Sequence, residues 1–327
     1  MTLSLYSLSI SARVTLDMHS LNNEGGEGNQ IQTRMVNVVD GNGDLQNVNA
    51  ISGDMYKHIQ AEHLFNVARN NQAMPLCEGC REFNANRINA DREFITWAKD
   101  KTVNDAEVIN RMLHTCGMDD IEGVLITEGR STPRKSVVEF GWVVGVPEHV
   151  QTDSYFHVKY SSDNAKSSES RQEEAKTGSN LGQSIFHRPA SSGVYALVCH
   201  VDIARIGFND ISQTYAISQA DRTVRTRALL ESLLYTFIKP NGAMRSSQAP
   251  HIVDVQGVLT YSTGPTPAPT VSPLKDGYEQ HIAGIVEQLG RISPDTVGIS
   301  PFASLAELTG LFGELIEQVD PFTLKYE

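Results

Sequence analysis

The sequence contains little cysteine and no long apolar run, and each absence excludes a class of protein. Four cysteines in 327 residues do not form the framework of a disulfide-stapled secreted domain. No apolar stretch approaches the roughly eighteen residues that span a membrane. The first ten residues, M-T-L-S-L-Y-S-L-S-I, lack the basic start and the cleavage site of a signal peptide. We therefore expect a cytoplasmic protein without a membrane partner.

Basic residues are also scarce, since 27 lysines and arginines face 39 acidic residues and the net charge is −12. A protein that binds nucleic acid usually carries a basic footprint. The acidic excess is uneven, however. Residues 271–327 hold three basic and nine acidic residues, a balance of −6 that is half of the total. The rest of the chain is only mildly acidic, so its composition is compatible with a local basic groove.

Motifs of the common enzyme classes are missing. The sequence contains no G-x-S-x-G, no H-E-x-x-H and no P-loop. It also lacks the run of aromatics, glycine and basic residues that lets a typical RNA-binding sheet stack bases. Five histidines show no mutual spacing that indicates a general base: His19, His157, His187, His200 and His251. We therefore predict no catalytic residue.

The N-terminal part of the chain has the period of β-structure. Apolar residues alternate with polar ones over residues 10–18, which predicts a half-buried strand. Residues 21–30, rich in glycine and asparagine, predict a polar loop, and the D-G-N-G turn within residues 35–50 predicts a β-hairpin. A helix is expected to begin after Ser52.

The remaining segments alternate between strands and helices and leave two polar regions. The expected elements are a polar stretch up to Asn104, a helix at 106–114, strands at 121–129 and 135–146, a weakly apolar segment at 151–189, a strand at 193–207, a helix at 223–238, a strand at 252–261, a Pro/Thr linker at 264–270 and an acidic helical C-terminus. This order predicts an α+β fold in which helices pack on an antiparallel sheet.

Seven segments, in order between residue 9 and about residue 260, carry a resemblance to a known family. They are I-S-A-R-V-T-L-D-M-H-S-L-N, A-I-S-G-D-M-Y-K-H, D-I-E-G-V-L-I, V-E-F-G-W-V-V-G-V, F-H-R-P-A-S-S-G-V-Y-A-L-V, R-I-G-F-N-D and N-G-A-M-R-S-S-Q. Together they resemble the backbone-subunit family of type I CRISPR Cascade complexes, specifically its DevR branch within the RAMP superfamily.

The resemblance implies an RRM-like (ferredoxin-like) antiparallel palm with an inserted helical subdomain and a long β-hairpin thumb. The chain then divides into palm at 1–70, 121–150 and 190–264, the inserted subdomain at 71–120, the thumb at 151–189, and a linker with the acidic helical C-terminal segment at 265–327.

The resemblance also implies a function. It predicts a non-catalytic backbone subunit that binds guide RNA, oligomerises along it and presents the spacer to a target. The implied partners are CRISPR RNA, the paired target DNA strand, further copies of the chain and other Cascade subunits. The implied RNA-binding residues are Asn22, Gly28, Arg34, Ser52, Gly53, Asp54, Lys57, His58, Phe156, Gln183, Phe186, Arg188, Gly242, Met244, Arg245 and Ser246.

Several of these residues also have ordinary structural explanations. Ser52 is a good N-cap, and an acidic residue in the first turn suits the helix dipole. The alternative is a phosphate on the backbone N–H groups of this turn, with Lys57 and His58 beside it. Arg245 is either a phosphate ligand or a solvated arginine. Phe156 and Phe186 either hold the thumb to its neighbour or stack on a nucleotide.

The cysteines suggest a metal site in the inserted subdomain. Cys77 and Cys80 have C-x-x-C spacing, and His114 and Cys116 supply two further ligand types at the other end of the insertion. These four residues are candidate ligands of a structural zinc ion, and buried or free thiols are the alternative. Cys199 lies in an apolar strand and is expected in the core. No cofactor is expected for catalysis.

Two other functions remain open at this point. The first is a metal-dependent ribonuclease of the related type III kind, which uses a loop aspartate; the loop after the first strand offers Asn22, Asn23, Glu24 and Glu27 but no aspartate, and Glu24 is the candidate that keeps this alternative open. The second is a DNA-binding regulator. The missing helix-turn-helix pattern and the acidic balance count against the regulator.

Overall fold

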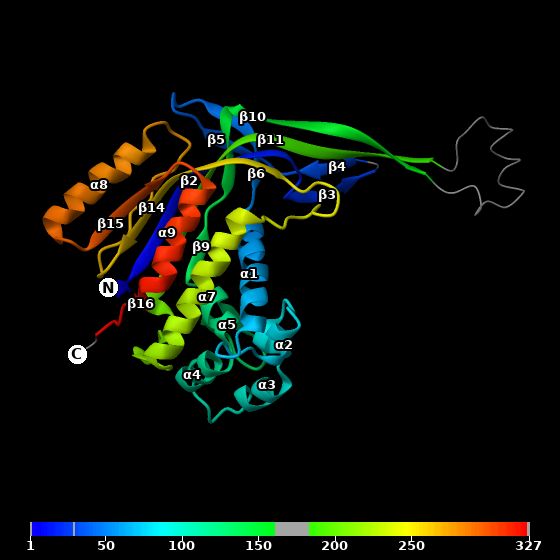
Figure 1. Cartoon of the computed structure of the whole chain (residues 1–327). Helices are drawn as coiled ribbons and strands as arrows, with labels where there is room; N and C mark the ends of the chain where they lie inside the picture. The colour runs from blue at the N-terminus through cyan, green and yellow to red at the C-terminus, as the bar shows by residue number, and fades with distance from the viewer. Residues whose placement is uncertain (1, 29, 161–182, 326–327) are drawn as a thin grey trace, which may run out of the picture.

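The computed structural model describes residues 2–28, 30–160 and 183–325, and it is built on one large twisted sheet. The strand order is β15-β14-β2-β11-β10-β6-β5, and neighbours along this path run antiparallel. The bounds are β2 (Ser7–His19), β5 (Met35–Val39), β6 (Leu45–Ile51), β10 (Val143–Tyr160), β11 (Gln183–Val201), β14 (His251–Ser262) and β15 (Val297–Phe302). Helices pack on this sheet (Figure 1), which confirms the predicted mixture of helices and antiparallel strands.

β2 lies in the middle of the sheet between β11 and β14. Its apolar residues Ile10, Ala12 and Leu16 are fully buried, as the alternation predicts. The expectation that the other face is open to solvent is wrong, because Ser9 and Ser11 are buried as well. The chain after β14 crosses that face, and Ser9 Oγ donates to the carbonyl oxygen of Ala268 at 3.0 Å.

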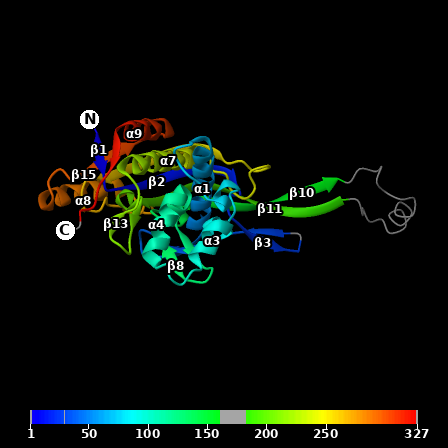
Figure 2. The same cartoon turned by 90° about the horizontal axis from the view of Figure 1, so that it is seen from below.

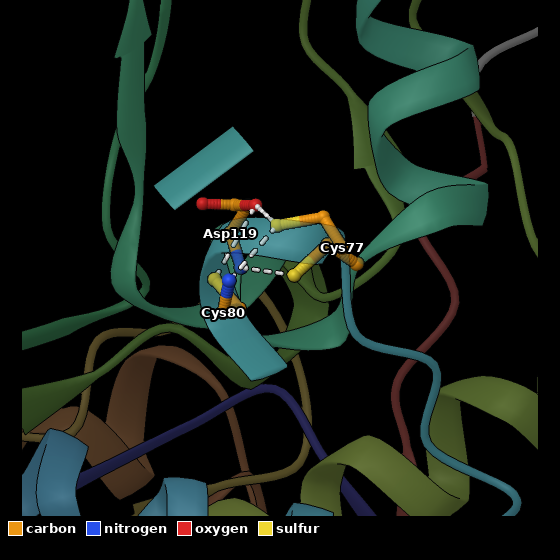
Figure 3. Close-up of side chains that lie close together, drawn as sticks. Cys77, Cys80 and Asp119 are labelled. Atoms are coloured by element: carbon orange, nitrogen blue, oxygen red, sulfur yellow. Dashed lines mark hydrogen bonds between the residues drawn. The ribbon is translucent and has the colours of Figure 1, made fainter. Parts of the chain in front are cut away.

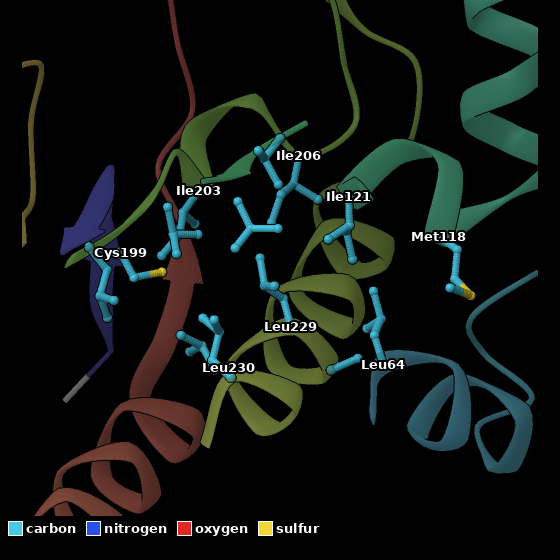
Figure 4. Close-up of a cluster of buried hydrophobic side chains, with 14 of the residues drawn as sticks. Leu64, Met118, Ile121, Cys199, Ile203, Ile206, Leu229 and Leu230 are labelled. Carbon is cyan, nitrogen blue, oxygen red and sulfur yellow. The ribbon is translucent and has the colours of Figure 1, made fainter. Parts of the chain in front are cut away.

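Three helices cover one face of the sheet and a fourth covers the other. α1 (Gly53–Asn70), α7 (Gln219–Ile238) and α9 (Leu305–Gln318) lie on one side, where their apolar side chains form the main core (Figure 4). α8 (Tyr278–Ile292) packs on Val258, whereas the next residue of β14, Leu259, faces the main core. None of the described helices is long and apolar enough to cross a membrane.

Residues 71–120 fold into a helical layer that lies below α1 and α7 in Figure 1. Its elements are α2 (Glu78–Arg81), η1 (Arg87–Ala90), α3 (Arg92–Ala98), α4 (Asp105–Thr115) and α5 (Gly117–Glu122). The predicted polar stretch up to Asn104 therefore contains the short helices α2, η1 and α3. Asp91 caps α3 by accepting from the backbone N–H of Phe94, whose side chain is buried.

Two other segments differ from the sequence-based expectation. The predicted loop at 21–30 contains a hairpin of β3 (Asn23–Glu27) and β4 (Gln30–Thr33), because backbone pairing is available even to a glycine-rich strand. The predicted strand at 121–129 begins inside α5, and β7 (Val124–Ile126) pairs with β8 (Thr132–Arg134). The predicted strand at 135–146 divides into β9 (Val138–Phe140) and β10, which both pair with β11, and β10 also pairs with β6.

The C-terminal segment is part of the sheet and not only a helical appendix. β15 pairs with β14 at the edge of the large sheet. β16 (Val319–Pro321) runs parallel to β1 (Leu3–Leu5), so the two ends of the described chain meet. η3 (Ile203–Arg205), β12 (Phe208–Asn209) and β13 (Thr214–Tyr215) connect β11 to α7.

A buried ionic network joins the helical layer to α7. Asp120 of α5 accepts from Arg134 Nη2 and from Arg225 Nη1, both at 2.7 Å, and from the backbone N–H of Gly207 at 2.9 Å. Arg134 also donates to the carbonyl oxygens of Phe208 and Arg205. Because charge in the interior is tolerated only when it is paired and hydrogen-bonded, this network fixes how α5, β8 and α7 meet.

Candidate nucleic-acid interface

The start of α1 is fixed by contacts within the chain. Ser52 Oγ accepts from the backbone N–H of Met55 at 3.2 Å and donates to Asn22 Oδ1 at 2.9 Å. A side chain at Gly53 would collide with the carbonyl oxygen of Phe140. Capping and close packing therefore account for Ser52, Gly53 and the buried Asn22. A phosphate role for this turn stays a prediction.

A cavity of about 290 Å³ lies beside the first two turns of α1. Its walls come from α1 and from the segment after α2, which sequence reasoning did not select. The lining residues are Asp54, Lys57, His58, Ala61, Cys80, Phe83, Asn84, Ala85, Arg87 and Met118. The cavity therefore brings Asp54, Lys57 and His58 of α1 next to Phe83 and Arg87 of the inserted layer. The sequence R-E-F-N-A-N-R at 81–87, in which basic residues flank an aromatic one, is the signal that could have identified this wall.

Lys57 and His58 differ in their surroundings. Partial burial lowers the pKa of Lys57, and the nearby Glu122 carboxylate opposes this effect. His58 is exposed, and its ring centroid lies 5.7 Å from that of Phe83. The cavity thus combines cations with a flat aromatic side chain, the two kinds of group that bind single-stranded nucleic acid.

The loop at 239–250 is attached to the end of β2 and to β11. The backbone N–H of Ala243 donates to the carbonyl oxygen of Leu21 at 3.1 Å, and a side chain at Gly242 would collide with Leu21. Gln248 Nε2 donates to the carbonyl oxygen of Pro189 at 3.0 Å. Gly242 therefore serves a close approach of two backbones, as glycine often does.

Arg245, in the same loop, is paired with a carboxylate of α1. Its Nη1 lies 2.6 Å from Glu62 Oε1 of α1, and its side chain is 57% exposed. Glu62 is one turn beyond His58, so the two residues share a face of α1. The ion pair therefore places Arg245 on the same side of α1 as His58. Ser246 is exposed beside it, and the carbonyl oxygen of Met244 accepts from the backbone N–H of Ser247 at 3.1 Å.

The base of the β10–β11 hairpin carries the predicted aromatic residues. Phe186 stacks on His157 across the two strands with 5.6 Å between ring centroids. The Arg188 guanidinium lies 4.7 Å from the Phe186 ring centroid, and Arg188 Nη1 donates to Ser247 Oγ at 3.2 Å. Phe156 meets the edge of His187 but is still 59% exposed. Phe186 therefore serves the hairpin itself, whereas Phe156 has an accessible face.

Four other candidate residues lie in or next to β3, β4 and β11. Gly28 is exposed in the turn between β3 and β4, with φ of 58°. The Arg34 guanidinium lies 5.3 Å from the Trp142 ring centroid. Gln183 begins β11 and Glu24 lies in β3, but the side chains of both are outside the described part of the structure. Residues 161–182 of the predicted thumb, 151–189, also lie outside the described residues.

The predicted metal ligands are brought together only in part. Cys77, Cys80 and Cys116 form one buried group with Asp119, and their ligand atoms all lie within 4.8 Å of one another (Figure 3). His114 is exposed on α4 and lies outside this group. Asp119 follows Cys116 by three residues, so both face the same side of α5. Cys199 is buried in the main core, as expected (Figure 4).

The environment of this cysteine cluster (Cys77, Cys80, Cys116 and Asp119) perturbs its acid groups. Hydrogen bonds from the Cys116 and Cys80 thiols lower the pKa of Cys77 to about 5. Burial raises the pKa of Asp119 well above its usual range. Hydrogen bonds to a thiolate stabilise its charged form and lower its pKa, whereas removal of a carboxyl group from water disfavours its charged form and raises its pKa.

Comparisons with known proteins identify a family and a solved structure with a similar fold. The family model for "CRISPR-associated negative auto-regulator DevR/Csa2" matches residues 10–282. No curated protein matches the chain. Among solved structures, a chain of "CRISPR RNA-guided surveillance complex, pre-nicking" is 14% identical, with a TM-score of 0.50 over 94% of this chain and 99% of that chain.

Two further solved structures are similar. A chain of "CRISPR RNA-guided surveillance complex" is 14% identical, with a TM-score of 0.47 over 95% of this chain and 98% of that chain. Csc2 of Thermofilum pendens is 11% identical, with a TM-score of 0.39 over 95% of this chain and 85% of that chain. At such identities the likeness concerns the fold alone. Because the family model covers most of the sequence, the chain belongs to the DevR/Csa2 family of CRISPR-associated proteins.

Proposed function

We propose that this protein is a non-catalytic backbone subunit of a CRISPR surveillance complex that binds the guide RNA. Membership of the DevR/Csa2 family supports the proposal, and so does the fold it shares with a chain of an RNA-guided surveillance complex. The observation that carries it is the position of the 239–250 loop. This loop is hydrogen-bonded to the end of β2 and to β11, and its Arg245 is paired with α1. These contacts bring together α1, the 239–250 loop and β11, which hold many of the predicted RNA ligands, and we infer that their exposed side chains form one surface.

This surface, which we call the groove, has the chemistry that sequence-independent RNA binding needs. It consists of Lys57, His58 and Arg87 at the cavity, Arg245 on the loop, and Arg188 and Phe156 at the base of the hairpin. Separated cations can follow a phosphate backbone, and exposed rings can stack on any base. The groove therefore suits a scaffold that must accept guides of any sequence.

Arg245 is the residue whose partner we expect to change on RNA binding. An arginine binds phosphate through the same two-pronged geometry that it uses for a carboxylate. Because the Arg245 side chain is largely exposed, exchange of Glu62 for a phosphate costs little desolvation. The ion pair holds Arg245 in place until RNA arrives.

The remaining parts of the proposal follow from the family. The sheet would act as an RRM-like palm and the protruding β10–β11 hairpin (Figure 2) as a thumb that interrupts the guide at regular intervals. Further copies of the chain would bind along the same CRISPR RNA, beside other Cascade subunits. The bases between thumbs would remain open to pair with a target DNA strand.

The first test measures RNA affinity. The full-length protein is titrated into a fluorescent CRISPR RNA, and anisotropy is recorded over a range of salt concentrations. We expect the double variant Lys57→Ala/Arg245→Ala to bind more weakly and to reduce the salt slope by about 1.4, since each lost phosphate contact on a single strand contributes about 0.7. Arg291→Ala is the matched control, because Arg291 is an exposed arginine on α8 that is also paired with a carboxylate.

Three outcomes would contradict the proposal. The first is a wild-type protein that binds no RNA. The second is a double variant whose affinity and salt slope equal those of Arg291→Ala. The third is cleavage of the RNA in the same samples, which would indicate the ribonuclease alternative. A stronger affinity for duplex promoter DNA than for RNA would indicate the regulator instead.

A further inference from the structure

The cysteine cluster has the dimensions of a site for a single metal ion. Tetrahedral zinc with Zn–S bonds of about 2.3 Å and a Zn–O bond of about 2.0 Å separates sulfur from oxygen by about 3.5 Å. The Cys77 Sγ to Asp119 Oδ2 distance is 3.3 Å, and the Cys80 Sγ to Asp119 Oδ2 distance is 3.7 Å. With all ligand atoms within 4.8 Å of one another, the cluster suits one ion and leaves no room for several metals with bridging sulfides.

The hydrogen bonds of the cluster leave part of it unexplained. Asp119 is fully buried, and its Oδ1 has no hydrogen-bond partner among the described residues. A buried carboxyl group normally satisfies both oxygens, because an unpaired one costs free energy. Three thiols, which are weak hydrogen-bond donors, are poor compensation for burying a carboxyl group. A cation at the centre would explain why a carboxylate is buried among three cysteines.

The surroundings can also stabilise the charge of such a site. A zinc ion bound by three thiolates and one carboxylate has a net charge of −2, and the protons that these four ligands still carry are released to solvent when the ion binds. The backbone N–H of Cys80 donates to Cys77 Sγ, and that of Asp119 donates to Cys116 Sγ, both at 3.4 Å. The Arg87 guanidinium acts on Asp119 as a nearby positive charge. Its Nη1 is buried and has no hydrogen-bond partner in the described part of the chain.

The geometry points to a structural zinc ion bound by Cys77, Cys80, Cys116 and Asp119. Zinc is the ion that closed sites with several thiolates select, and a closed site with four protein ligands is structural and not catalytic. His114, which the H-x-C spacing suggests as the fourth ligand, is replaced by Asp119. The ion would link the start of α2 to the start of α5, two segments that are 39 residues apart at Cys77 and Cys116.

The ion would also support one wall of the cavity beside α1. Cys80 lines that cavity, together with Phe83, Asn84 and Arg87 from the segment that follows it. This segment contains two non-glycine residues with positive φ, Phe83 at 53° and Arg87 at 50°. Such backbone persists only when its surroundings fix it. Zinc at Cys77 and Cys80 would fix the start of this segment.

The test is the metal content of the full-length protein, purified without chelators or affinity metals and measured by elemental mass spectrometry. We expect about one zinc per chain in the wild type and loss of zinc in Cys116→Ser and Asp119→Ala. Two matched controls should retain it: Cys199→Ser, which removes a buried cysteine outside the cluster, and His114→Ala, which removes the ligand that spacing alone suggests. None of these measurements depends on RNA binding.

Two outcomes would overturn the inference. One is a wild-type protein without stoichiometric metal, even after exposure to zinc under reducing conditions. The other is loss of zinc in His114→Ala with retention in Asp119→Ala, which would leave a metal site but with the wrong fourth ligand.

A second measurement covers the case in which the ligand variants fail to fold. Wild-type protein is freed of metal with a chelator and reloaded with Co²⁺, whose absorption reports thiolate ligands and tetrahedral geometry. Hydrogen exchange of residues 78–91 is followed before and after. We expect thiolate-to-cobalt bands, and exchange that speeds up on metal removal and slows again on reloading. Absence of these bands would contradict the inference, and so would a hydrogen-exchange rate in residues 78–91 that does not change when the metal is removed and reloaded.

Discussion

The buried arginines that join the helical layer to β8 and α7, and the exposed arginines of the groove, use the same side chain for opposite purposes. Arg134 is fully buried and donates to Asp120 and to several backbone carbonyls. Arg245 is 57% exposed and has Glu62 as the partner of its guanidinium. A guanidinium with many fixed partners serves the fold, whereas one with a single partner at the surface can exchange it. Position, and not residue type, decides which arginines are available to a ligand.

The physical reason is the cost of leaving a charge unpaired. In the interior, removal of one partner leaves a desolvated charge, so the network cannot open. At the surface, water screens the charges and the pair contributes little to stability. The groove can therefore rearrange at low cost, while the network beneath it holds α5 and α7 in place.

The largest expected effect tests the buried side of this comparison. Asp120→Ala removes the shared partner of Arg134 and Arg225 and should lower the free energy of unfolding by about 3–5 kcal/mol, as measured by urea denaturation. Asp276→Ala is the matched control, because Asp276 pairs with Arg13 at the same 2.7 Å but is 93% exposed. It should cost less than about 1 kcal/mol. Similar costs for the two variants would refute the distinction.

The next effect concerns a buried group that titrates. Burial lowers the pKa of His19 to about 4. The folded protein therefore keeps His19 neutral while the unfolded chain protonates it below about pH 6.5. The resulting stability is complete above pH 6.5 and is lost as the pH falls toward 4, by up to about 3 kcal/mol.

The measurement is urea denaturation at several pH values between 7 and 4 for the wild type and His19→Gln. The variant should lose less stability over this range, whereas His281→Gln, at an exposed histidine, should follow the wild type. If the free energy of unfolding falls by the same amount between pH 7 and pH 4 in all three proteins, His19 is not the titrating group.

The smallest effect on stability tests the groove. Glu62→Gln releases Arg245 and should change the free energy of unfolding by less than about 1 kcal/mol. RNA affinity should rise, because a competing carboxylate is lost next to the proposed phosphate ligand. Glu287→Gln releases Arg291 on α8 in the same way and should leave RNA affinity unchanged. Equal changes in affinity would point to general charge and not to the groove.

The sequence predicted the elements with a strong period or a clear signal. The strand at 10–18, the D-G-N-G hairpin, the helix after Ser52 and the helix at 223–238 all occur in the structure. The sequence did not locate α2, η1 and α3 before Asn104, because these elements are too short to show a period. The hairpin of β3 and β4 was missed because glycine and asparagine indicate a loop even where the backbone pairs.

The candidate sites were predicted less completely than the fold. Lys57, His58 and Arg245 were selected through the resemblance. Their neighbours in space were not, because they lie far away along the chain: Phe83 and Arg87 from the two residues of α1, and Glu62 from Arg245. Gly53 and Gly242 belong to matching motifs, yet the structure explains both by close packing. The C-x-x-C spacing identified Cys77 and Cys80 and the H-x-C spacing identified Cys116, whereas the same spacing suggested His114 in place of Asp119.

By itself the sequence determined the secondary structure of the long elements and the family, because both depend on residues that are neighbours in the chain. Tertiary structure alone decided which charges are buried, which residues line the cavity and which carboxylate joins the cysteines. Those properties depend on distances between segments that the sequence leaves unspecified. Asp120 and Asp54 are both acidic residues near the start of a helix, and only the packing of α7 over one of them makes it part of the core.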